Sequence, residues 1–184
     1  MHLLSRGTPD LSPATQPTSQ WEWEFAQAII PKPTHNKATP RLAPTPTIDT
    51  IICHTGAAWN KDHKVTGLAW IFSNPDSTEI SRGSFLQTVV SSPLMAEALA
   101  IREALLHASA HHYKRIWLRS DSQGLITAIN SNLQSIELYS ILSDVYSMIS
   151  SKFLSVLFSF ISRTLNGPAD SLAKARLCMN PLDF

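Results

Sequence analysis

Residues 93–122 combine a helix, a strand and the start of a second helix, and this order constrains the fold more than any other stretch. Ser92 followed by Pro93 is typical of a helix N-terminus, because serine caps free N–H groups and proline fits the first turn. The apolar residues that follow at helical spacing are Leu94, Met95, Ala98, Leu99, Ile101, Leu105 and Leu106. The next run, 115–119, has an apolar centre between charged ends and predicts a short strand.

Two carboxylates stand at notable places in this stretch. Glu97 lies in the first turns of the predicted helix, close to its apolar face, and Asp121 follows the predicted strand directly. Ligand chemistry in open α/β sheets is usually located at the C-terminal ends of strands. We therefore expect Glu97 and Asp121 to lie close together. The alternative for Asp121 is an ordinary helix N-cap, a position that aspartate suits well.

The rest of the pattern predicts the order strand–strand–strand–helix–strand–helix–helix–strand–helix. We expect strands at 48–59, 65–72, 79–90 and 153–162, the last largely buried, and helices at 122–133, 136–150 and 169–176, after a break at 166–168. Short connections make the first three strands antiparallel, whereas helical crossovers make the later two parallel to their neighbours. The predicted fold class is α/β, with one mixed five-stranded sheet flanked by helices.

The first 47 residues differ from the remainder because proline is concentrated there. Eight of the twelve prolines precede Ile48, and proline blocks both helices and central strands. We predict a disordered Pro/Thr-rich segment over 1–47, a domain over 48–178 and a C-terminal tail over 179–184. Within the first segment, 21–30 can form a short helix with Trp21, Phe25 and Ile29 on one stripe, which a protein partner can bind. Weak residual helicity without a partner is the alternative.

Composition excludes several classes of protein. The formal net charge is +1, so overall charge does not predict nucleic-acid or membrane binding. Two cysteines, Cys53 and Cys178, form neither a disulfide framework nor a C-x-x-C metal motif. No secretory signal is visible, and the longest apolar run, 153–161, is too short to span a membrane. We therefore expect an intracellular protein without a membrane partner.

Five motifs, taken together and in this order, resemble the ribonuclease H type 1 fold. They are Ala57-Ala58-Trp59-Asn60, Gly67-Leu68-Ala69-Trp70-Ile71-Phe72, Ala96-Glu97-Ala98-Leu99-Ala100, Ser120-Asp121-Ser122 and Asn166-Gly167-Pro168-Ala169-Asp170-Ser171-Leu172-Ala173-Lys174. More closely, the chain looks like the plant, retroelement-derived proteins that carry a reverse-transcriptase-associated ribonuclease H domain. The resemblance covers roughly residues 50–178.

The resemblance implies nucleic-acid binding and Mg²⁺-dependent hydrolysis of the RNA strand of an RNA–DNA hybrid. In that family four carboxylates hold two Mg²⁺ ions about 4 Å apart, and Mg²⁺ prefers oxygen ligands. Glu97, Asp121 and Asp170 match three of the four positions and are the implied catalytic and metal-binding residues. The alternative for Asp170 is a carboxylate that offsets the dipole at a helix N-terminus.

The fourth position departs from the family pattern. Gly56 stands where the family has its first aspartate, and Ile52, His54 and Ala58, which share its face of the strand, supply no carboxylate. The family's mobile histidine is also not apparent, because Arg163-Thr164-Leu165 occupies that region. We therefore expect impaired cleavage, with at most weak binding of one metal ion. The alternative is an inactive nucleic-acid-binding or protein-interaction domain.

Other residue groups give weaker signals. His107 and His111, at i and i+4 of a helix, can bind a metal, but no third ligand is obvious and histidine is favoured near a helix C-terminus. Three tryptophans are expected in the core: Trp59, Trp70 and Trp117. Four basic residues can contact phosphates or simply be solvated: Lys61, Lys64, Arg82 and Lys114.

Overall fold

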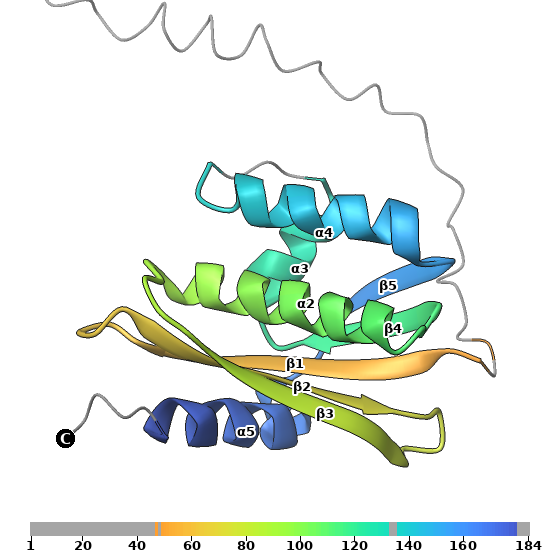
Figure 1. The fold of residues 1–184 in the computed structure, drawn as a ribbon, viewed down its shortest axis with the longest axis horizontal. Coiled ribbons are helices and arrows are strands. Elements are labelled where there is room, and N and C mark those ends of the chain that lie inside the picture. Colours follow the sequence, from red (N-terminus) through yellow and green to blue (C-terminus); the bar gives the residue numbers. More distant parts are fainter. Residues whose placement is uncertain (1–46, 48, 133–135, 180–184) are drawn as a thin grey trace, which may run out of the picture. The chain divides into compact units, whose positions relative to one another are not determined.

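The computed structural model describes residue 47 and residues 49–132 and 136–179. Its strands form one five-stranded sheet, and the helices pack around that sheet (Figure 1). The elements are β1 (Ile51–Asn60), β2 (Val65–Ser73), β3 (Glu79–Gln87), α2 (Pro93–Ala110), β4 (Arg115–Ser120), α3 (Gln123–Asn130), α4 (Tyr139–Lys152), β5 (Ser155–Phe160), a 3₁₀ turn (Arg163–Leu165) and α5 (Gly167–Cys178). The strand order is β3-β2-β1-β4-β5. β1, β2 and β3 pair antiparallel, whereas β4 pairs parallel with both β1 and β5. The predicted fold class is confirmed.

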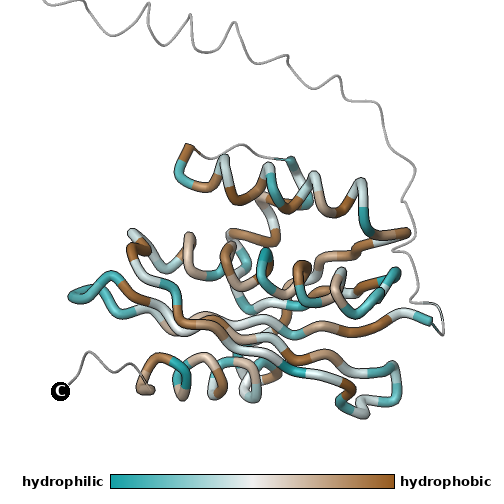
Figure 2. The backbone as a smooth tube through the Cα atoms, viewed as in Figure 1, coloured by the Kyte–Doolittle hydropathy of each residue, from teal (hydrophilic) through white to brown (hydrophobic). Residues whose placement is uncertain are grey.

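The main core lies between one face of the sheet and α2 and α3, and α4 adds to it by packing on α2 (Figure 1). Ser92 caps α2 as predicted, since its Oγ accepts a hydrogen bond from the Met95 N–H at 3.1 Å. The fully buried apolar side chains of this layer include Cys53, Leu68, Phe72, Leu105 and Leu118. Figure 2 shows that hydrophilic residues gather instead at the two hairpin turns that join β1 to β2 and β2 to β3.

The opposite face of the sheet carries α5, and small residues allow this helix to approach closely. Ala58, Ala69 and Ala173 form a separate buried cluster between β1, β2 and α5. Gly67 faces the same helix so closely that a built Cβ would lie 2.1 Å from the Ala173 carbonyl oxygen. The backbone of α5 is therefore seated directly on the sheet, and this seating fixes the position of Asp170 in its first turn.

Two core predictions are wrong, because α5 packs on β1, β2 and β3 and leaves this face of β4 and β5 uncovered, and because β5 is an edge strand. The side chains of β5 are mostly half-buried, so the predicted burial of this strand is not found. Trp117 is also half-buried, on the α5 side, and its Nε1 donates to Ser159 Oγ at 2.8 Å. Trp70 does lie in the main core, and Trp59 packs against it.

Several element boundaries also differ from those predicted. β3 ends at Gln87 rather than 90, because Val89 has a positive φ of 59° and the Val90 N–H donates to the Lys64 carbonyl. α5 begins at Gly167 rather than 169, since Pro168 fits the first turn of a helix instead of breaking it. α3 and β5 are shorter than predicted, and α4 is shifted towards the C-terminus.

The predictions for 1–46, including the short helix at 21–30, and for 180–184 fall outside the described residues. Within the described part of the chain, no helix is long and apolar enough to cross a membrane.

Candidate functional site

Glu97 is held against β1 by the seating of α2 on the sheet. Its carboxylate accepts a hydrogen bond from the backbone N–H of Ala57, while Oε2 is buried without a partner. Burial, followed by repulsion from Asp121, raises the pKa of Glu97 to about 8, although the Ala57 N–H and Arg163 oppose this rise. In the absence of a bound cation, Glu97 therefore holds its proton more tightly than an ordinary glutamate does.

Asp121 follows β4 and points towards the loop before α5. Its Oδ1 accepts a hydrogen bond from Asn166 Nδ2 at 2.7 Å, and the same nitrogen donates to the Thr55 carbonyl at 2.8 Å. The N-cap of α3 is Ser122, so the interpretation of Asp121 as a helix cap is wrong. Asn166, fully buried, thereby ties the end of β4 to β1 and to the start of α5.

Asp170 lies in the first turn of α5, as its sequence position predicts, and it is paired with two basic residues. Lys174 Nζ lies 2.6 Å from its Oδ2, and Arg163 lies 3.5 Å from its Oδ1. Arg163 Nε also lies 4.0 Å from Asp121 Oδ2. A single guanidinium therefore lies between the two aspartates, and because its side chain is 72% exposed it can move away.

Gly56 is buried beside this group, and the start of α5 fills the space next to it. A Cβ built at Gly56 would lie 3.1 Å from both the Ala169 carbonyl carbon and the Asp170 nitrogen. Those contacts are tighter than normal packing, so an aspartate at this position requires α5 to shift by a few tenths of an ångström. The sequence offers no signal for this crowding, because it arises from the docking of α5.

The side chains present do not fit two Mg²⁺ ions. Gly56 supplies no oxygen, and of the three remaining carboxylates Asp170 is paired with Lys174 and Arg163. Among the described residues, no group of three or more His, Cys, Asp or Glu side chains is arranged to hold a metal ion. The arrangement offers instead a partly neutralised acidic group bordered by an exposed arginine.

Sequence reasoning missed two residues of this site, Asn166 and Arg163. The sequence predicts only a break between two elements at 166–168 and places Asn166 in a family motif, whereas the structure shows that this buried asparagine orients Asp121. For Arg163 the sequence shows only that it stands in the region where the family has its mobile histidine. Its contacts with Asp121 and Asp170 depend on how the 3₁₀ turn brings the chain back to β4, and local sequence patterns do not encode that return.

The other sequence candidates lie apart from this site. The rings of His107 and His111 stack with centroids 4.1 Å apart, and their nitrogens contact Ser81 Oγ and the His107 carbonyl oxygen. Arg82 is paired with Glu79, and Lys114 donates to the Lys152 carbonyl oxygen. Lys61 and Lys64 are exposed at the turn between β1 and β2, where they can contact a ligand.

Several solved structures share this fold at low sequence identity. RNase H1 from Halobacterium salinarum is 19% identical with a TM-score of 0.66, and the match covers 71% of this chain and 99% of that one. LC11-RNase H1, isolated from compost and solved in complex with an RNA/DNA hybrid, is 15% identical with a TM-score of 0.65, and the match covers 70% of this chain and 96% of that one. The N-terminal RNase H domain of a Mycobacterium tuberculosis protein is 14% identical with a TM-score of 0.63, covering 70% and 94%.

Sequence comparison identifies the family. No curated protein sequence matches this chain. The sequence model of the reverse transcriptase-like family matches residues 54–176, well over half of the 184 residues, and this span includes Glu97, Asp121 and Asp170. With its mixed sheet and RNase H structural neighbours, the chain belongs to the reverse transcriptase-like family and has the ribonuclease H-like fold.

Proposed function

We propose that this domain binds RNA–DNA hybrid and that hydrolysis of the hybrid, the activity implied by the RNase H resemblance, is strongly impaired. The fold and the hybrid-bound LC11 structure support the binding. The observation that carries the impairment is Gly56, which supplies no carboxylate and packs closely against the backbone of Ala169 and Asp170. Derivation from a plant retroelement belongs to the same proposal and rests on the five sequence motifs alone.

The charge state of the site supports this proposal. Asp121 and Asp170 carry negative charge, and Arg163 and Lys174 already oppose it. A cation that bound there would have to displace these ammonium and guanidinium groups. Loss of a residue that only supports a metal ligand costs about 10–100-fold in affinity or activity, so loss of a direct ligand is expected to cost more.

Binding of the hybrid is expected to be weak and to depend on salt, because lysine and arginine contacts to phosphates release counterions. The slope of log affinity against log salt is about −0.9 for each phosphate contacted on B-form DNA, which serves as a guide for a hybrid. A salt titration by fluorescence anisotropy measures this slope. An affinity that does not change between low and moderate salt would favour the alternative, a protein-interaction domain that uses Trp21–Ile30.

Replacing Gly56 with aspartate is expected to raise Mg²⁺-dependent cleavage of the hybrid above that of the unmodified chain. The substitution restores the missing carboxylate, but α5 must give way at Ala169 and Asp170. We expect an accompanying loss of about 1–3 kcal/mol in the free energy of unfolding. Cleavage of a labelled hybrid and urea denaturation of the same preparation measure the two effects.

The matched control for this experiment is Gly56→Asp combined with Asp121→Asn, which keeps the size of the side chain and removes its charge. We expect this double variant to be as stable as Gly56→Asp and inactive. A Gly56→Asp protein that is folded but cleaves no better than the unmodified chain would contradict the prediction, and it would locate the impairment in more than this one residue.

A further inference from the structure

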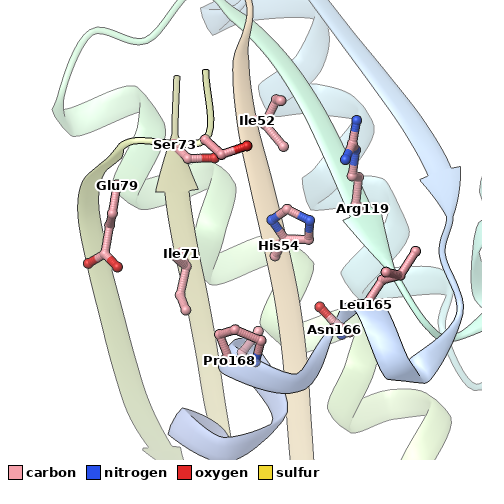
Figure 3. Close-up of a pocket in the computed structure, with 11 residues that line it drawn as sticks. Ile52, His54, Ile71, Ser73, Glu79, Arg119, Leu165, Asn166 and Pro168 are labelled. Carbon is pink, nitrogen blue, oxygen red and sulfur yellow. The ribbon is translucent and has the colours of Figure 1, made fainter. Parts of the chain in front are cut away.

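A pocket of about 230 Å³ opens on the α5 side of the sheet (Figure 3). It lies between the start of α5 and the part of the sheet that α5 leaves uncovered. Ile52 and His54 of β1, Ile71 of β2 and Arg119 of β4 line the sheet side, and Asn166 and Pro168 line the helix side. Drug-sized ligands usually occupy about 300–1,000 Å³. The pocket therefore suits a smaller group.

Arg119 gives this pocket an uncompensated positive charge. Its guanidinium lies 4.0 Å above the Trp117 ring, and its Nε is buried without a hydrogen-bond partner. No carboxylate of the described residues forms an ion pair with it.

The other polar groups of the pocket are suited to the same anion. Across the part of the chain described, the His54 ring has no hydrogen-bond partner, and it lies on the neighbouring strand directly beside Arg119 in register. Glu79 is the only carboxylate among the lining residues, and Arg82 holds both of its oxygens at 2.5 and 2.7 Å. An anion that enters the pocket therefore meets two unpartnered donors and a neutralised carboxylate.

Asn166 adds an acceptor that no protein group satisfies. The residue is fully buried, and its Nδ2 is oriented by two acceptors, the Thr55 carbonyl and Asp121. That orientation turns Oδ1, which has no partner, towards the His54 side of the pocket (Figure 3). A buried acceptor without a donor is costly, and a hydroxyl group on the ligand would satisfy it.

We propose that this pocket, the Arg119 pocket, binds a sugar phosphate. The phosphate accepts hydrogen bonds from Arg119 and His54, a sugar hydroxyl donates to Asn166 Oδ1, and the carbon skeleton packs against Ile52, Ile71 and Pro168. Guanidinium groups suit phosphate because they can donate two parallel hydrogen bonds to it. The group can come from a free sugar phosphate or from the 5′ end of an RNA strand. Only the second source rests on the proposed function.

The proposal is tested by titrating the full chain with ribose 5-phosphate and following its NMR spectrum, with ribose as the control that lacks the anion. We expect shifts at Ile52, His54 and Ile71 with ribose 5-phosphate and not with ribose. Arg119→Gln should weaken binding roughly tenfold or more, since a charge-assisted hydrogen bond is lost. Lys152→Gln, which removes the same charge from the exposed end of α4, should leave the affinity unchanged.

A second variant, His54→Phe, keeps a planar ring and removes its nitrogens, so the proposal can be tested even if Arg119→Gln does not fold. Unchanged affinity in whichever of the two variants is folded would overturn the proposal, as would shifts confined to the turn at Lys61. Competition by a 5′-phosphorylated RNA strand, but not by its unphosphorylated form, would identify the strand as the source. Without that competition, binding identifies a free sugar phosphate. If the chain fails to bind the hybrid, the proposed function is contradicted. The results of the ribose 5-phosphate titration and of the two variants are not affected.

Discussion

Gly67→Ala is expected to reduce the free energy of unfolding by about 3 kcal/mol, the upper part of the usual range for overpacking. The added methyl group would lie 2.1 Å from the Ala173 carbonyl oxygen and 2.7 Å from the Leu177 nitrogen, both in the backbone of α5. A rotamer change cannot relieve contacts with backbone atoms, so the helix must move off the sheet. Urea denaturation followed by circular dichroism measures the loss.

Gly124→Ala is the matched control for that substitution. Gly124 lies in α3, and nothing stands within 4 Å of a Cβ built there. Alanine in a helix is more stable than glycine by roughly 0.5–1 kcal/mol, so this variant should gain stability. If Gly67→Ala were as stable as the unmodified chain, the result would contradict the close packing of α5 on β2. It would also contradict the position given for Asp170, because this residue lies in the first turn of α5.

Glu97→Gln is expected to change how stability depends on pH. The pKa of Glu97 is about 8 in the folded protein and lies near 4.5 in the unfolded chain. Below about pH 4 both the folded and the unfolded chain bind the proton, so Glu97 does not reduce the free energy of unfolding. As pH rises towards about 8, the unfolded chain loses the proton first, and the folded state loses roughly 4 kcal/mol relative to it.

The measurement for Glu97 is the free energy of unfolding of both proteins at about pH 4 and about pH 9 in metal-free buffer. Glutamine cannot titrate, so the variant should become the more stable of the two proteins as pH rises, by up to roughly 4 kcal/mol in the free energy of unfolding. Comparing the two proteins cancels the contribution of the other titrating groups. Identical pH profiles would show that Glu97 is not held in a buried environment against Asp121.

Local patterns were sufficient for those parts of the fold that depend on near neighbours in the chain. The Ser92-Pro93 signal placed the start of α2 at Pro93, and the charged ends of the run at 115–119 bounded β4 within one residue. The alternation of side chains along β1 correctly placed His54 on the face of Gly56, which the pairing of β1 with β2 and β4 bears out.

Features that depend on which surfaces meet were not predictable in this way. Trp117 was expected in the core, but nothing in its own strand indicates that α5 stops short of β4. Arg163 reaches Asp121 and Asp170 only through the 3₁₀ turn, and the crowding at Gly56 exists only because α5 docks there. The acidic residues themselves were found from motifs, whereas their neutralisation became visible only in the structure.

The most direct test of the central claim is one preparation of the unmodified chain, assayed for both binding and cleavage of a labelled RNA–DNA hybrid with and without Mg²⁺. The account predicts salt-sensitive binding in both conditions and no more than trace cleavage in either. Asp121→Asn serves as the background for cleavage. Robust Mg²⁺-dependent cleavage that disappears in Asp121→Asn would contradict the account, because it would show a working catalytic site despite Gly56.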